Sequence, residues 1–177
     1  MIIFHPCLWH LHSIKEEVMQ YQDIRSQIKS GDLFAWRNNS LFDRLIRIWT
    51  AGSYNHVGIA WVKWGRVFVL QDRMQDGIDM VVLSRQLPCD WISTNAIWND
   101  EVEEFAFQNM GQHYGHINIL TAALNTKPIG NAMVCSEYAS AILKKAGIVL
   151  PNQPNWSPSG LVDELLNQNK ILENIKE

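Results

Sequence analysis

The sequence has few features of an exported, membrane or nucleic-acid-binding protein. No apolar run approaches a membrane span, which needs about 20 consecutive apolar residues. The apolar N-terminus, M-I-I-F-H-P-C-L-W-H-L-H, carries no basic region and no small-residue cleavage site, so we expect no signal peptide and a cytoplasmic location. A formal net charge of −3 disfavours nucleic acid as the main partner, since phosphate binding needs a basic surface.

Cysteine is also scarce. The chain has only Cys7, Cys89 and Cys135, an odd number at irregular spacing that does not form a disulfide framework and suits a reducing compartment. Cys7 with His10 and His12 could suggest a metal site, but no second cluster of ligands completes one elsewhere. We therefore expect no metal and no cofactor.

The composition fits an ordinary globular domain. With 177 residues, 47% hydrophobic and 19% charged, the chain is long enough for one sizeable core, and it has no internal repeat, low-complexity run or linker. We therefore expect a single domain over 1–177, in which 30–165 form the core and 1–28 form an N-terminal extension. The eight tryptophans are enough to line a groove as well as to fill the core.

The extension should contain an amphipathic helix over 13–29. Ser13 can cap it, Glu16 follows three residues later as in a capping box, and apolar residues recur at helical spacing. Its polar face lacks the lysines and arginines that a membrane-surface helix carries, so we expect it to pack on the body.

The middle of the chain alternates as strands do. A hairpin is expected from strands at 56–62 and 66–71 around Gly65, with further strands at 31–36, 78–83 and 91–98. Helical patterns occur at 40–49, before the hairpin, and at 100–110, 117–124, 131–147 and 157–166, after it.

The helix expected over 131–147 carries a cysteine in its first turn. Cys135 shares one apolar face with Ala139, Ile142 and Leu143. The positive end of a helix dipole favours the thiolate, the reactive form, although a cysteine on an apolar helix face is also an ordinary core residue.

A cysteine nucleophile needs a base and a group that orients the base. Among the six histidines, His56 is best placed, because it opens an apolar strand after a glycine-serine turn. In the expected hairpin, Gln71 and Asp72 lie opposite His56 with side chains on opposite faces. Only one of the two can share the side of the imidazole.

Six motifs follow one another in an order that is more specific than any one of them. They are G-D-L-F, S-Y-N-H-V-G-I-A, V-F-V-L-Q-D-x4-G-I, H-Y-G-H, V-C-S-E-Y-A and S-P-S-G-L. Together they resemble the circularly permuted NlpC-type papain-like superfamily of cysteine hydrolases, in its YiiX/YebB-like branch. The resemblance covers about 30–165 and places histidine before cysteine.

The resemblance implies an α+β fold, papain-like in the permuted arrangement, with a small antiparallel sheet packed against the cysteine-bearing helix. It implies Cys135 as nucleophile, His56 as base and Gln71 as the residue that orients His56. The backbone N–H of Cys135, at the helix start, would donate to the oxyanion, and Tyr54 is a candidate second donor.

The sequence departs from the family pattern at two places. The third residue of the family is often glutamate; by its spacing to 77–78 it falls here on Gln71, which can orient a ring but brings no charge. The family also tends to have Tyr-Asp where this chain has Tyr-Gly-His at 114–116.

The expected function is therefore that of a thiol hydrolase acting on amide bonds, with a bacterial cell-wall peptide as substrate by the habits of the family. One alternative is the same pair acting on lipid acyl esters or in acyl transfer, since the permuted branch resembles lecithin–retinol acyltransferase. Another is a non-catalytic binding module on this fold, whose thiol would have an ordinary pKa.

Overall fold

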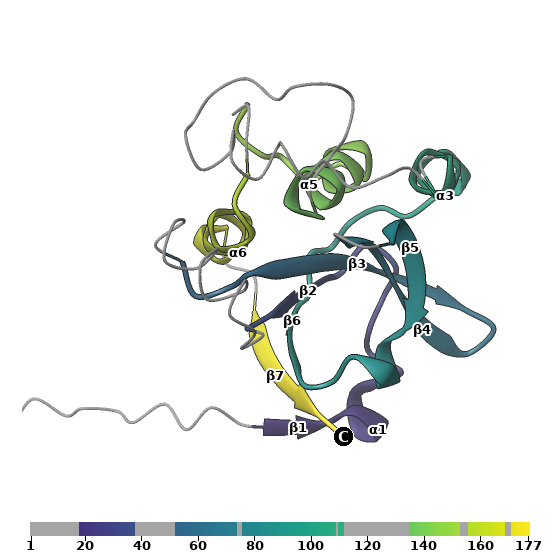
Figure 1. Cartoon of the computed structure of the whole chain (residues 1–177), viewed down its shortest axis with the longest axis vertical. Coiled ribbons are helices and arrows are strands. Elements are labelled where there is room, and N and C mark those ends of the chain that lie inside the picture. Colours follow the sequence, from purple (N-terminus) through teal and green to yellow (C-terminus); the bar gives the residue numbers. More distant parts are fainter. Residues whose placement is uncertain are drawn as a thin grey trace, which may run out of the picture.

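The computed structural model describes residues 18–37, 52–73, 76–108, 110–111, 135–152, 156–168 and 171–177. These residues form an α+β fold around one sheet of seven strands, in the order β1-β7-β6-β2-β3-β4-β5 (Figure 1). The strands are β1 (Val18–Gln20), β2 (Leu33–Trp36), β3 (His56–Lys63), β4 (Arg66–Arg73), β5 (Gly77–Val82), β6 (Cys89–Ile92) and β7 (Leu172–Lys176). The helices are α1 (Tyr21–Ile24), α3 (Asp100–Phe107), α5 (Cys135–Lys145) and α6 (Pro158–Asn167), with a short 3-10 turn, η1 (Leu83–Arg85).

The sheet is mixed and larger than the small antiparallel sheet expected. Its pairs are antiparallel except at one edge, where β1 runs parallel to β7. The difference arises because both ends of the described chain add strands to the sheet. In Figure 1, β7 and β1 lie together, with α1 beside β1 and on the opposite side from α5 and α6.

The helix expected over 13–29 is wrong where the structure describes it. Residues 18–20 form β1 and only Tyr21–Ile24 is helical, while 13–17 lie outside the described residues. The backbone of 18–20 pairs with 174–176 of β7, a partner that local periodicity cannot reveal. Ile24 and Ile28 are nevertheless buried, so part of the apolar pattern does mark a core-facing surface.

The central hairpin confirms the prediction. Strands β3 and β4 pair in register from Ile59 with Leu70 to Lys63 with Arg66. The turn between them has positive φ at Trp64 and Gly65, of 52° and 69°, as a tight two-residue hairpin turn requires.

The helix expectations are confirmed for α3, α5 and α6, whereas those at 40–49, 117–124 and 131–134 lie outside the described residues. Helix α6 begins as a capped helix should: Ser157 accepts a hydrogen bond from the Gly160 N–H, and Pro158 takes the first position. No helix within the described ranges is long and apolar enough to cross a membrane.

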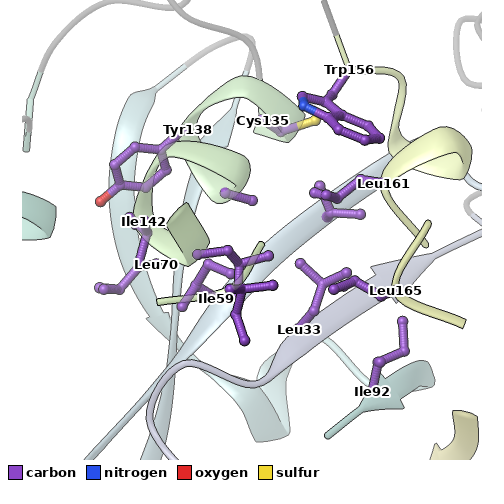
Figure 2. Packing of buried hydrophobic residues seen from close by; sticks show 14 of the residues in the cluster. Leu33, Ile59, Leu70, Ile92, Cys135, Tyr138, Ile142, Trp156, Leu161 and Leu165 are labelled. Atoms are coloured by element: carbon purple, nitrogen blue, oxygen red, sulfur yellow. The ribbon is translucent and has the colours of Figure 1, made fainter. Parts of the chain in front are cut away.

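Two buried clusters lie on opposite faces of the sheet. The first cluster joins α5 and α6 to the sheet (Figure 2). Its strand residues include Val57 and Ile59 of β3 and Leu70 of β4. The second cluster includes Ala60 of β3 and Val69 of β4, which alternate with the residues of the first. This alternation decides which side chains of β3 and β4 face the cysteine helix.

The Gly-Asp motif before β2 is a structural device. Buried Asp32 accepts hydrogen bonds from the Lys29 N–H at 2.8 Å, the Trp91 indole at 3.0 Å and the Thr94 N–H at 3.1 Å. Gly31 has a φ of +94°, and a Cβ there would lie 2.5 Å from the Cβ of Ala96. The motif therefore ties the entry of β2 to the segment after β6.

Candidate active site

His56 and Gln71 form a hydrogen-bonded pair at the ends of neighbouring strands. His56 opens β3, and its Nε2 lies 2.7 Å from Oε1 of Gln71 near the end of β4. The Gln71 side chain is fully buried. The imidazole also contacts the indole of Trp36, its cross-strand partner in β2, with ring centroids 5.4 Å apart. The hydrogen bond to Gln71 and the contact with Trp36 both come from regular strands, so they fix the position of the ring on the sheet.

Gly58 makes the approach of these two side chains possible. A Cβ at this position would lie 2.5 Å from Cγ1 of Val69 and 3.3 Å from Cβ of Gln71. The first distance is too short for any real contact, so β4 could not keep its place beside a larger residue. The glycine of the His-Val-Gly-Ile motif thus serves the site, because it lets Gln71 lie close to β3 and reach the ring two residues away.

Cys135 is the first residue of α5, which packs on β3 and β4 over the first cluster. Figure 2 shows it at the start of the helix among the residues of that cluster. The backbone N–H groups of Val57 and Ser136 lie close enough to its sulfur to lower the pKa of the thiol. The thiol is therefore held against the residue of β3 that directly follows His56.

The resting thiol differs from the low-pKa thiolate that the helix start led us to expect. The side chain is only 4% exposed, and burial raises its pKa to about 12. The carboxyl group of Asp72 raises that pKa further, whereas the two backbone hydrogen bonds lower it. Desolvation exceeds the stabilisation that the helix start gives to a thiolate, so the cysteine rests in its neutral form.

The pair and the thiol approach β3 from its two faces. Gln71 and His56 lie on the side of the second cluster, where the ring meets Trp36. The thiol lies on the side of the first cluster. The structure thus brings His56 together with Gln71, and it brings Cys135 together with the N–H of the adjacent Val57.

Asp72 lies on the thiol side, as strand alternation requires once Gln71 faces the other way. Its side chain is 1% exposed, and neither carboxyl oxygen has a hydrogen-bond partner. Burial, together with the nearby carboxyl groups of Glu137 and Asp79, raises its pKa to about 8. The sequence placed Asp72 opposite His56 but gave no sign that α5 would bury it.

Tyr54 has both of its donors engaged within the protein. Its N–H donates to Oγ of Ser159 at 2.8 Å, and its hydroxyl donates to Asp90 at 2.6 Å. Arg37 donates to the same hydroxyl at 2.8 Å and forms an ion pair with Asp90, also at 2.8 Å. An oxyanion role for Tyr54 would require one of these bonds to break.

The bonds of Tyr54 show what the motifs around it contribute to the fold. Ser159 belongs to the S-P-S-G-L motif at the start of α6, and Tyr54 belongs to the S-Y-N-H motif before β3. Sequence reasoning missed this connection and missed Arg37 and Asp90 altogether. The only sequence signal for Arg37 and Asp90 was their partner Tyr54, which stands two residues before His56.

The remaining site expectations concern metals. Among the residues that the structure describes, no group of three or more His, Cys, Asp or Glu side chains could hold a metal ion. Cys7, His10 and His12 lie outside the described residues. His113 and the H-Y-G-H motif also lie outside them.

Comparison with known proteins gives a match in structure alone. No protein-family model matches the sequence, and no curated protein matches it. The crystal structure of the metalloprotein YiiX from Escherichia coli O157:H7 superposes with a TM-score of 0.64 at 14% sequence identity. The match covers 85% of this chain and 98% of that one. The chain therefore has the fold of YiiX, over most of its length.

Proposed function

We propose that this protein is a cysteine hydrolase that cleaves amide bonds, with peptides of the bacterial cell wall as substrates. The observation that carries the proposal is the pair formed by His56 and Gln71, whose 2.7 Å hydrogen bond orients an imidazole one residue away from the N–H that contacts the Cys135 sulfur. Thiol catalysis needs a base held by a third residue and a thiol at a helix start, and both are present at the first residues of β3, on its two faces.

Gln71 sets the tautomer of His56. The Oε1 atom can only accept, so Nε2 of His56 donates its proton to Oε1 and Nδ1 is the nitrogen that accepts. A ring in this tautomer is a general base at Nδ1. The buried amide fixes the plane of the ring but supplies no negative charge to the imidazolium that forms during the reaction.

The proposed reaction starts from a neutral thiol. For this step the ring of His56 turns from its observed face of β3 toward the sulfur. With a pKa of about 12, Cys135 then gives its proton to His56 only as the sulfur attacks the carbonyl carbon of the amide. The S–C bond forms, the carbonyl π pair moves to oxygen, and the backbone N–H of Cys135 at the start of α5 donates to that oxyanion.

The tetrahedral intermediate collapses when His56 returns the proton to the leaving nitrogen and the C–N bond breaks. Water then attacks the thioester, His56 takes a proton from that water, and the same proton goes back to the sulfur as the acid leaves. His56 ends each half of the cycle in its starting protonation state. No atom changes its oxidation state, so the reaction needs no redox partner.

YiiX is described as a metalloprotein, and the residues described in this chain do not fit a metal centre. They offer no set of three metal-binding side chains, and the sulfur of Cys135 contacts backbone N–H groups. The mechanism therefore contains no step through a metal, and every proton transfer above uses a side chain of this chain.

The substrate class rests on the family that the motifs resemble, and a direct comparison of substrates tests it. The purified protein would be incubated with soluble muropeptides and, separately, with a fatty-acyl ester, and released amine and fatty acid would be measured. We expect peptide release and no release of fatty acid. Release of fatty acid alone would favour the acyl-ester alternative, and release of neither product would favour a binding module.

A further inference from the structure

A buried carboxyl group lies beside the thiol and has no hydrogen-bonding role in the fold. Asp72 is 1% exposed, and both of its oxygens lack hydrogen-bond partners. An unpaired buried carboxylate normally costs several kcal/mol, so proteins seldom keep one that does nothing. Across the packing interface with α5, its charge acts on the thiol of the candidate nucleophile Cys135.

The groups around Asp72 form a small cluster at the first turn of α5. From α5, Glu137 raises the pKa of Asp72, and Asp72 in turn raises the pKa values of Cys135 and Tyr138. From β5, Asp79 also raises the pKa of Asp72. No described positive group acts on Asp72 through this cluster, so every charge that faces it is negative.

The neighbouring positive and basic groups face elsewhere. Arg73 pairs with Asp79 and Asp76, and the His56 ring bonds to Gln71 on the other face of β3. The adjoining strand β5 places Ile78 opposite Asp72. The hydroxyl of Tyr138 does not reach Asp72 either, because it donates to the carbonyl of Ala106 at 2.9 Å.

Asp72 forms no hydrogen bond with the thiol through which a proton could pass. A hydrogen bond between the two would count as a partner for the carboxyl group, and Asp72 has none. The carboxyl group can therefore influence the sulfur only through its electric field. When Asp72 is neutral, the field is weak; when it is ionised, it opposes a second negative charge in the same buried cluster.

We propose that Asp72 is a positioning residue that controls the charge of the Cys135 thiol, so that the nucleophile ionises less readily once Asp72 has lost its proton. This proposal rests on the proposed function, since it assigns a control to the same thiol. The proton of Asp72 leaves to solvent as pH rises, the carboxylate then disfavours the thiolate, and hydrolysis should lose rate on the alkaline side.

The pKa of Asp72 places this control close to physiological pH. Burial raises it to about 8, so Asp72 is neutral at neutral pH and ionised a little above it. A field that shifts the thiol pKa by one unit changes the thiolate population about tenfold.

The test compares wild-type protein with Asp72→Asn, which keeps the shape of the side chain and cannot ionise. The rate at which iodoacetamide labels Cys135 would be followed by peptide mass spectrometry from about pH 6 to about pH 10. We expect equal rates at the acid end, where the side chain at position 72 is uncharged in both proteins. At the alkaline end Asp72→Asn should label about tenfold faster.

Asp76→Asn is the matched control, because it removes an exposed carboxylate that pairs with Arg73 and is not among the groups that raise the pKa of Asp72. A ratio of Asp72→Asn to wild-type rates that stays constant across pH would overturn the proposal. An equal pH-dependent gain in Asp76→Asn would overturn it too, since the effect would then belong to net charge.

Hydrolysis provides a separate readout. The alkaline loss of activity in the wild type should be absent in Asp72→Asn. If no protein hydrolyses the substrate, the proposed function fails, while the labelling ratio still decides whether Asp72 controls the thiol. If hydrolysis is present but its pH profile is identical in both proteins, the control by Asp72 fails alone.

Discussion

Gln71 holds the imidazole of His56 through a 2.7 Å hydrogen bond, while its neighbour Asp72 points to the opposite face of β4. Two adjacent residues thereby serve different partners. The amide fixes the ring, and the carboxyl group lies with the thiol under α5. This division is a consequence of strand alternation, and it gives each residue a separate experimental signature.

Replacement of Gln71 should lower the rate of the reaction without abolishing it. In Gln71→Ala the ring loses its orientation but can still titrate, so we expect kcat to fall about ten- to a thousandfold. Gln71→Glu should retain activity or improve it, because Nε2 of Gln71 is a buried donor without a partner and a carboxylate would stabilise imidazolium. Steady-state kinetics would measure both variants.

Exposed Gln108 at the end of α3 supplies the control for that series, since Gln108→Ala removes the same group from a surface position outside the His56–Gln71 pair. Equal kcat values for Gln71→Ala and wild type would contradict the role of Gln71. A fall in Gln71→Ala as deep as that of Cys135→Ala would also do so.

Gly58→Ala should disturb the site through the sheet. The added Cβ would lie 2.5 Å from Cγ1 of Val69, so β4 must move, at a cost of about 1–3 kcal/mol in the free energy of unfolding. Chemical denaturation would measure that cost, and kcat should fall with it because Gln71 moves as well. The double variant Gly58→Ala with Val69→Ala removes the clashing atom and should recover part of both losses. No recovery would count against the clash as the cause.

The stability of the protein should depend on pH through Asp72. The pKa of this carboxyl group is raised from 3.8 to about 8 on folding, so the folded state holds a proton that the unfolded state releases from about pH 4 upward. The contribution of Asp72 to the free energy of unfolding is complete below its pKa in the unfolded state. It is lost as pH rises through its pKa in the folded state. The Tm of Asp72→Asn should therefore equal that of the wild type near pH 4 and exceed it increasingly toward about pH 8. A Tm difference that does not change with pH would contradict the shift.

Tyr54→Phe should weaken the fold more than the reaction. It removes the hydroxyl that donates to Asp90 and accepts from Arg37, and we expect a loss of about 1–3 kcal/mol in the free energy of unfolding. Thermal denaturation would show this loss while kcat stays within about threefold of wild type. A large fall in kcat with an unchanged Tm would instead restore Tyr54 as an oxyanion donor.

Much of the site geometry could be predicted from the sequence because strands obey simple rules. Gly65 marks the turn of the hairpin, and period-two alternation assigns Gln71 and Asp72 to opposite faces. The register differs from the expected one, because Ile59 pairs with Leu70, so that Gly58 and not His56 lies across from Gln71. The start of α5 near Cys135 followed from helical periodicity and from the lysines at its end.

The parts that could not be predicted depend on contacts between distant segments. The strands β1 and β7 are short, and they pair with segments that are distant in the sequence, so no local pattern marks them. The protonation state of Cys135 depends on how completely α5 and the first cluster cover it, and the helix dipole alone suggested the wrong direction. The place of Asp72 in the site could not be predicted for the same reason, because its burial depends on how α5 packs on the sheet.

Cys135→Ala tests the central claim most directly. Alanine suits the first turn of a helix and changes little volume, so the variant should fold with the Tm of the wild type. Release of amine from soluble muropeptides would be compared between the two proteins at equal concentration. The account predicts measurable release by the wild type and none by Cys135→Ala, and release by the variant at the wild-type rate would contradict it.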